Sequence, residues 1–279
     1  MSDPAQLRFS VVVPAYNEEA FLADTLRSLR HQDYRGTYEI LVVDNNSTDA
    51  TAEIARSFGV RVVSEPEPGV CQARQRGLTE ARGEIVVSVD ADTLYPPDWL
   101  ARIDASFRSR DRVVGVGGPC RYRDAPWWIG GFTTVLFGLV NLVYRASGWL
   151  GYVTATNTAF LKSAFDGYDL HLTQGGDELD LLRRLRKRGR MVWDRDNEVA
   201  TSPRRQESGM LQTVFVSFLV FYLGAYFLNR IARRPVLGRA PVFRVEHGRR
   251  RRFRWGVGVG VAVLVTTTFG VARYLLGSS

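Results

Sequence analysis

The chain contains few of the residues that build disulfide frameworks and zinc sites. It has two cysteines, Cys71 and Cys120, and three histidines among 279 residues. Two cysteines cannot form a disulfide scaffold, and no Cys/His cluster has the spacing of zinc ligands. The first apolar run, residues 9–13, is short and has no basic segment before it, so we expect no secretory signal there. A reducing compartment fits this composition.

Most of the chain also lacks net charge. The formal charge is +8, but residues 229–254 alone hold ten arginines against the single acid Glu246, which leaves −1 for the rest. Such a tract could bind nucleic acid. It lies between two long apolar runs, however, at 210–228 and 256–276. We therefore favour contact with anionic membrane lipid and expect no nucleic acid as a partner.

The first ninety residues alternate between strand-like and helix-like patterns. Strands are predicted at 9–13, 38–43, 60–63 and 84–89, with helices at 18–29, 51–58 and 71–81 between them. This alternation predicts an α/β fold of parallel βαβ units with both sheet faces covered. Ligands of such sheets bind beyond the carboxyl ends of the strands. We expect the polar clusters at Asn17, Asp44 and Asp90 to converge at that edge.

The pair Asp90 and Asp92 directly follows the buried strand at 84–89. Side chains at i and i+2 of a strand share a face, so the two carboxylates are expected to point the same way. Neighbouring anions repel unless a cation lies between them or one is protonated. Oxygen ligands of this kind suit Mg²⁺ or Mn²⁺ with substrate phosphates. The alternative is an acidic turn that precedes the next helix.

The middle of the chain is less regular. We predict a strand at 113–117, an apolar helix at 129–144 and a helix at 175–188 with acids at its start. Asn141 and glycines interrupt the apolar helix, which favours core or membrane-surface packing over a membrane span.

Four polar blocks follow one another along the chain: Val12–Glu19, Val43–Asp49, Asp90–Asp92 and Gly176–Leu181. They occur in the order seen in family 2 glycosyltransferases, and the chain resembles that family over roughly residues 8–205. The resemblance implies an inverting enzyme with the GT-A fold, a Rossmann-like, mostly parallel mixed sheet flanked by helices. It further implies a nucleoside diphosphate sugar as the donor.

Several positions match the family's donor-binding residues. They are Pro14, Ala15, Tyr16, Asn17, Glu18, Asp44, Asn46, Arg74, Asp90, Ala91, Asp92, Asn157, Arg204 and Arg205. Turn and cap chemistry is the alternative for the asparagines and Asp44. Arg74 either faces the substrate pocket or lies on a solvated helix face. For Arg204 and Arg205, a position in a surface loop is an equally good alternative to a site near the diphosphate.

In this family, a divalent ion at Asp90 and Asp92 would stabilise the departing diphosphate. Inversion also needs a base that removes the acceptor proton, and the family supplies it from an acidic pair that opens a helix. The order of that pair is reversed here, Asp177 before Glu178, with Asp180 close by. We favour Glu178 as the base, with Asp177 next.

The C-terminal third is predicted to attach the enzyme to a membrane. We divide the chain into a catalytic domain (1–205), an interfacial apolar helix with the arginine-rich segment (206–254) and a transmembrane helix (255–279). One crossing keeps the arginines and the catalytic domain on the cytoplasmic side. A lipid-linked or polyprenyl phosphate acceptor fits this arrangement. Small residues at 256–260 could pair helices into a homodimer.

Two other interpretations remain open. A nucleotidyltransferase would also use paired aspartates, but residues 12–19 contain no glycine for a phosphate loop. A non-catalytic membrane partner would retain the fold, and the reversed acidic pair favours it slightly. The sequence does not identify the sugar; UDP or GDP is the expected nucleotide.

Overall fold

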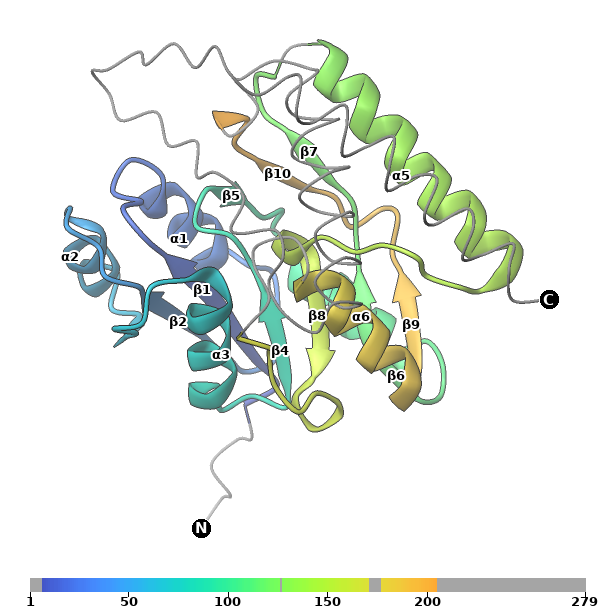
Figure 1. The fold of residues 1–279 in the computed structure, drawn as a ribbon, viewed down its shortest axis with the longest axis horizontal. Coiled ribbons are helices and arrows are strands. Elements are labelled where there is room, and N and C mark those ends of the chain that lie inside the picture. Colours follow the sequence, from blue (N-terminus) through green and yellow to red (C-terminus); the bar gives the residue numbers. More distant parts are fainter. Residues whose placement is uncertain (1–6, 126, 171–176, 205–279) are drawn as a thin grey trace, which may run out of the picture. The chain divides into compact units, whose positions relative to one another are not determined.

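The structure, a computed structural model, describes residues 7–125, 127–170 and 177–204 (Figure 1). One unit takes in residues 1–173 and 177–203, and it is the part treated below. The second unit, 174–176 and 204–279, lies outside the described residues except for Arg204. The predicted segments 206–254 and 255–279 therefore lie outside the described residues as well.

The main sheet has seven strands in the order β3-β2-β1-β4-β8-β6-β9. Their bounds are β1 Phe9–Ala15, β2 Tyr38–Asp44, β3 Arg61–Ser64, β4 Ile85–Ser88, β6 Val113–Gly117, β8 Thr158–Leu161 and β9 Arg190–Trp193. The first four pair in parallel, while β8 runs antiparallel to both neighbours, β4 and β6. The predicted mostly parallel, mixed sheet is thus confirmed.

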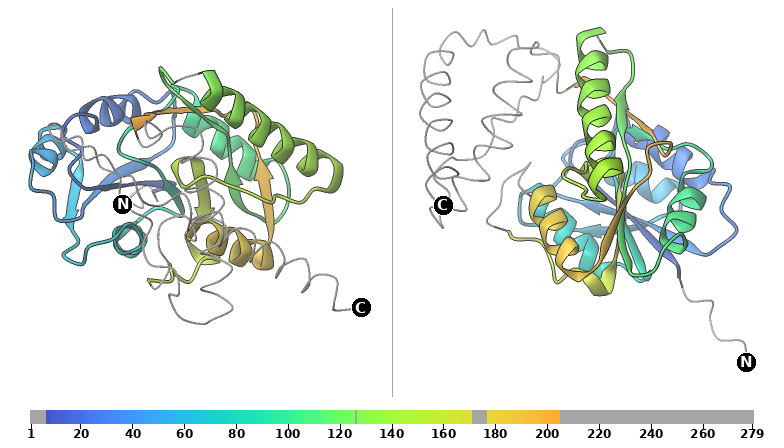
Figure 2. Two further views of the ribbon diagram at one scale, coloured as in Figure 1. Left: turned by 45° about the horizontal axis from the view of Figure 1, so that its top comes forward. Right: turned by 90° about the vertical axis from the view of Figure 1, so that its right-hand side faces the viewer.

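Helices cover both faces of this sheet (Figure 2). They are α1 Leu22–Arg30, α2 Thr51–Ser57, α3 Val70–Glu80, α4 Trp99–Arg108, α5 Trp127–Ser147 and α6 Asp177–Arg188. Strands β1 and β4 are buried along almost their whole length, as expected where both faces are covered. Helix α1 begins four residues later than predicted, because residues 17–21 form the turn that follows β1.

A second, three-stranded sheet was not predicted. It consists of β5 Thr93–Leu94, β10 Val199–Thr201 and β7 Cys120–Tyr122, in the order β5-β10-β7. Strands of two or three residues are too short to show periodicity in the sequence. This sheet holds the segment after Asp92, since Thr93 pairs with Thr201.

Helix α5 is buried along one stripe only. Ile129, Thr133, Phe137 and Val140 face the core, and the Phe137 ring stacks on Trp193 of β9 with centroids 5.8 Å apart. Within the described residues, α5 is the one helix long and apolar enough to be a candidate for a membrane span. Only 17% of its most apolar stretch is buried.

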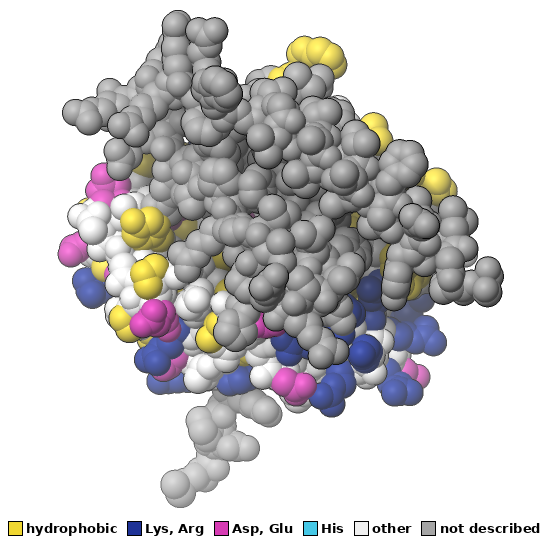
Figure 3. All heavy atoms as spheres, in the orientation of Figure 1, with side chains coloured by type: hydrophobic (Ala, Val, Ile, Leu, Met, Phe, Trp, Pro, Cys, Tyr) yellow, Lys and Arg dark blue, Asp and Glu magenta, His cyan; other side chains and the backbone are white. Residues whose placement is uncertain are grey.

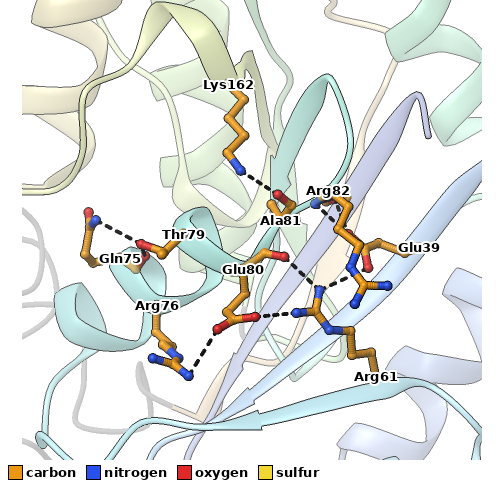
Figure 4. Close-up of polar contacts among 10 residues, drawn as sticks. Glu39, Arg61, Gln75, Arg76, Thr79, Glu80, Ala81, Arg82 and Lys162 are labelled. Carbon is orange, nitrogen blue, oxygen red and sulfur yellow. Dashed lines mark hydrogen bonds and ion pairs between the residues drawn. The ribbon is translucent and has the colours of Figure 1, made fainter. Parts of the chain in front are cut away.

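The amino-end edge of the sheet is fixed by a charged network (Figure 4). Arg61 of β3 forms an ion pair with Glu80 at the end of α3 and donates to the Glu80 carbonyl at 2.7 Å. The same guanidinium lies 3.4 Å from Glu39 of β2, and Arg76 reaches Glu80 at 3.1 Å. The network therefore joins the last turn of α3 to β2 and β3.

Close packing of α3 on the sheet depends on Gly77. A Cβ at this position would overlap Val12 Cγ1 and lie 3.3 Å from Val43 Cγ2. We expect Gly77→Ala to lower the free energy of unfolding by about 1–3 kcal/mol, because overpacked cores force side chains and backbone to shift. Thermal unfolding of the variant measures this.

Gly131→Ala on α5 is the matched control. Nothing lies within 4 Å of a Cβ built there, so alanine should leave the melting temperature unchanged or raise it. Equal melting temperatures for Gly77→Ala and the wild type would contradict the close approach of α3.

Candidate active site

The first two sequence blocks meet at the carboxyl ends of β1 and β2. Ala15 pairs with Asp44, and the backbone N–H of Asn45 donates to the Ala15 carbonyl at 2.8 Å. One turn later, the backbone N–H of Glu18 donates to the Thr51 hydroxyl at 2.7 Å. The predicted convergence of these blocks at one sheet edge is therefore present.

Two asparagines of these blocks hold the turns. Asn17 and Asn46 have φ angles of 52° and 62°, a left-handed backbone that asparagine tolerates. Asn17 Oδ1 accepts from the Thr48 N–H at 2.8 Å, and Asn46 Nδ2 donates to the Pro66 carbonyl at 2.7 Å. These bonds match the turn interpretation for both side chains. Tyr16, by contrast, is 41% exposed beside them.

Arg74 is buried and does not lie on a solvated helix face. Its side chain is 5% exposed and forms an ion pair with Asp177. Its Nη2 lies 3.5 Å from Asp90 Oδ1, and its Nη1 lies 3.9 Å from Glu178 Oε1. Burial alone would lower the Arg74 pKa, but these three carboxylates outweigh burial and raise it above the ordinary value. Arg74 is thus a permanent cation that joins the aspartate pair at 90–92 to the acidic pair at 177–178.

The acidic pair at the start of α6 has two distinct environments. The Asp177 side chain is 1% exposed and is held by Arg74, whereas that of Glu178 is 13% exposed. Glu178 Oε2 has no hydrogen-bond partner among the described residues. Burial and then the Asp177 carboxylate raise the pKa of Glu178 well above its ordinary value, with Arg74 opposing them. Glu178 therefore has the features expected of a proton acceptor.

Asp180, predicted as a third catalytic acid, is held by arginines of its own helix. Its carboxylate accepts from Arg183 at 2.6 Å and from Arg184 at 2.7 Å, both on its own helix. Burial raises its pKa, but these two hydrogen bonds outweigh burial and hold the pKa below the ordinary value. We therefore assign Asp180 to helix stabilisation, since an acidic group so firmly ionised is a weak base.

A chain of buried hydroxyl groups leads to Asp92. Thr201 donates to Asp92 Oδ1 at 3.3 Å, and Thr93 donates to Thr201 at 3.0 Å. The Thr93 hydroxyl also lies 2.9 Å from that of Thr156. Tyr95, in turn, donates to the Thr156 carbonyl at 3.2 Å. Together these groups orient the Asp92 carboxylate.

Sequence analysis missed this series of hydrogen-bonded hydroxyl groups. Thr93 adjoins the aspartate pair, which is the one signal that pointed to it. Thr156 and Thr201 lie 64 and 109 residues from Asp92, and only the pairing of β5 with β10 brings Thr201 close. The Tyr95 hydroxyl also accepts from the Asp90 N–H at 3.2 Å, which fixes the other end of the same turn.

The donor set at this turn fits a divalent ion. Asp90 and Asp92 supply hard carboxylate oxygens, and Ala91 between them is buried. Within the described residues, no group of three or more His, Cys, Asp or Glu side chains could form a complete metal cage. Mg²⁺ and Mn²⁺ sites that bind phosphates use one or two carboxylates and take the remaining ligands from substrate and water.

Asn157, predicted among the donor-binding residues, is part of the scaffold in the structure. Its Nδ2 donates to the Pro119 and Asn197 carbonyls at 2.9 and 2.7 Å, and its Oδ1 accepts from Trp99 Nε1 at 2.9 Å. The side chain is buried and its donors are fully used. We therefore assign it a structural role.

Of the two remaining predicted residues, Arg204 and Arg205, the structure describes only the first. Arg204 is half-exposed and follows the last residue of the described unit, and Arg205 lies outside the described residues. The backbone N–H of Ser202 donates to the Asp92 carbonyl at 3.2 Å, so the chain passes the aspartate pair just before them. A role for both arginines near a diphosphate stays a prediction.

Comparison with known proteins decides the family. The model of the family described as "Glycosyl transferase family 2" matches residues 10–168, more than half of the chain. The chain belongs to glycosyl transferase family 2. Its α/β architecture is the GT-A fold, as the resemblance implied.

Solved structures agree on the fold. A mannosyltransferase from Pyrobaculum calidifontis, in complex with GDP-Man and Mn²⁺, has a TM-score of 0.63 and 24% identity, and covers 86% of this chain and 70% of its own. Glucosyl-3-phosphoglycerate synthase from Mycobacterium tuberculosis, with Mn²⁺ and UDP-glucose, has a TM-score of 0.58 and 23% identity. It covers 82% of this chain and 80% of its own.

Two curated relatives are named for lipid-phosphate substrates. Undecaprenyl-phosphate 4-deoxy-4-formamido-L-arabinose transferase of Edwardsiella ictaluri is 33% identical over 152 residues, 50% of this chain and 46% of its own. Dolichol-phosphate mannosyltransferase of Pyrococcus furiosus is 32% identical over 115 residues, 39% of this chain and 33% of its own. The chain spans 38% to 52% of the first curated relatives it matches.

The hydroxyl chain gives a test of the aspartate turn. We expect Thr201→Val to weaken Mn²⁺ binding about tenfold, because a hydrogen bond to a charged group contributes about 1.5 kcal/mol. Electron paramagnetic resonance of free Mn²⁺, titrated against the protein with UDP or GDP present, measures the affinity.

Thr79→Val on α3 is the control, since its exposed hydroxyl bonds only within its helix. Unchanged Mn²⁺ affinity in Thr201→Val would show that the hydroxyl chain does not orient a metal ligand.

Proposed function

We propose that the chain is an inverting glycosyltransferase that moves a sugar from a nucleoside diphosphate sugar to a hydroxyl or phosphate group of a lipid-linked acceptor. One observation carries this proposal. Arg74, itself buried, holds the aspartate turn and the acidic pair together through contacts to Asp90, Asp177 and Glu178. A leaving-group site and a base must lie close together for direct displacement at the anomeric carbon.

The donor side is the edge formed by β1, β2 and β4. Tyr16 and Asp44 flank the edge at which the nucleoside would bind, and Asp90 and Asp92 lie where the diphosphate would follow. A divalent ion held by the two aspartates would act as a Lewis acid on the departing diphosphate. The Mn²⁺ in the Pyrobaculum and Mycobacterium structures supports this assignment.

The acceptor side is the start of α6. Glu178 would accept the proton of the attacking group, because its oxygen Oε2 has no hydrogen-bond partner among the described residues and its pKa is raised. Asp177 would act as a positioning residue, since its ion pair with Arg74 fixes the first turn of α6. Glu178, with its longer side chain, stands where the family has the aspartate that acts as the base.

A lipid-linked acceptor is supported by the names of the undecaprenyl-phosphate and dolichol-phosphate relatives. We propose that the catalytic domain works at the cytoplasmic face of the cell membrane, where sugar nucleotides are available. UDP and GDP sugars are the donors to try first, given the ligands of the two solved structures.

Donor binding tests the proposal most directly. Thermal-shift titration with UDP-, GDP- and dTDP-sugars should show one nucleotide that raises the melting temperature by several degrees, and only with Mn²⁺ present. Asp92→Asn should abolish that rise because it removes a metal-binding charge. A chain that no donor stabilises, or one stabilised equally in chelator, would contradict the proposal.

The base has its own test. Glu178→Gln should lower kcat about 10²–10⁴-fold with little change in the KM for the donor, since the carboxylate acts on the acceptor proton. In the wild type, kcat/KM should rise with pH as Glu178 loses its proton, with a midpoint above the ordinary glutamate value of about 4.3.

Asp180→Asn, two residues along the same helix, is the matched control. It should keep most of the activity, because Arg183 and Arg184 of the same helix hold the Asp180 carboxylate. If instead Asp180→Asn removed activity and Glu178→Gln retained it, the assignment of the base would be wrong.

A further inference from the structure

Helix α5 presents an apolar face that the described domain does not cover. Val135 and Leu142 are 65% and 64% exposed, and Leu139 and Val143 extend the same stripe. Hydrophobic side chains reach the surface along the line of α5 in the space-filling view (Figure 3). Exposed apolar stripes of this length mark an interaction surface.

The helix cannot be surrounded by lipid. Its other stripe, Ile129 to Val140, is part of the hydrophobic core, and Phe137 stacks on Trp193. The segments on both sides of α5 belong to the same unit. Strand β7 ends at Tyr122, shortly before α5, and Leu150, which follows α5, is buried. A span would place those ends on opposite sides of a bilayer, about 30 Å apart. The helix therefore lies along one surface.

The composition of the exposed face fits a bilayer interface. Trp127 and Trp149 mark the two ends of the stripe and are 87% and 53% exposed. Tryptophan is enriched where apolar lipid meets headgroups. Helix α5 contains no acidic residue, and its only charge is Arg145 in the last turn. Arg186 of α6 stacks on the Trp149 ring at 4.7 Å and adds a second cation at this end.

The last described strand ends beside the segment that leads into α5. Thr201 of β10 pairs with Tyr122 of β7, and the Arg123 N–H donates to the Thr201 carbonyl at 2.8 Å. The chain leaves the domain there, and the apolar run 210–228 begins nine residues later. In the sequence, therefore, an apolar run long enough to cross a bilayer follows the described unit directly.

We infer that α5 is an interfacial membrane helix, which lies in the plane of the bilayer with Val135, Leu139 and Leu142 in the acyl region just below the headgroups. The contact fixes the orientation of the catalytic domain as well as its distance from the membrane. It is separate from any attachment by residues 206–279, and it does not depend on the proposed reaction.

Site-specific labelling of the full chain tests this contact. An environment-sensitive fluorophore is attached to Leu139→Cys or Val135→Cys, and the protein is reconstituted into vesicles of phosphatidylcholine with phosphatidylglycerol. The natural Cys71 and Cys120 are buried and should not react. We expect a nitroxide near the top of the lipid chain to quench the label at least twofold more than one at the chain end, with little quenching by aqueous iodide.

Ser57→Cys at the end of α2 is the control, because α2 packs near β3 at the far edge of the sheet from β9 (Figure 1). Iodide alone should quench the fluorophore at position 57. Iodide quenching at position 139 would show that α5 faces water, and strongest quenching by the deep nitroxide would show a span. Protection from all three quenchers would show that protein covers the face, either residues 210–228 or a second copy. Each of these results would overturn the inference, and none involves donor or acceptor.

Discussion

A single buried cation holds the candidate site together. Arg74 lies among Asp90, Asp177 and Glu178, which come from a strand end and a helix start that are far apart in the chain. Three carboxylates so close would repel one another in a buried setting, and removing one partner of a buried ion pair costs about 3–5 kcal/mol. The distance between the aspartate turn and the acidic pair is therefore set by one guanidinium.

Helix α3 places that guanidinium. At its amino end Arg74 faces the site, and at its carboxyl end Glu80 is tied to Arg61 of β3. Between them, Gly77 lets the helix backbone approach Val12 and Val43 closely. A helix fixed at both ends and packed without a side chain in the middle has little freedom to shift. Its rigidity explains how a residue on α3 can position side chains from two other elements.

The sequence predicted the regular part of this architecture well, and the reasons are physical. Strands β1, β2 and β4 are buried on both faces and read as apolar runs, and the helices between them have apolar periodicity. The roles of individual side chains were harder to predict. Asn157 and Asp180 carry the right chemistry, but their hydrogen bonds to Trp99 and to Arg183 and Arg184 are contacts that motif spacing does not report.

The sequence by itself determined the order of the elements, the aspartate pair after β4, the acids at the start of α6 and the family to which the chain belongs, because each depends on neighbours within a few residues or on motifs in a fixed order. Only the tertiary structure decided how the environments of Asp177 and Glu178 differ, which arginine is buried and which face of α5 is exposed. These properties depend on contacts between residues such as Arg74 and Asp177, or Thr201 and Asp92, that lie more than a hundred positions apart. Burial and pairing of charges arise from packing, which local pattern does not encode.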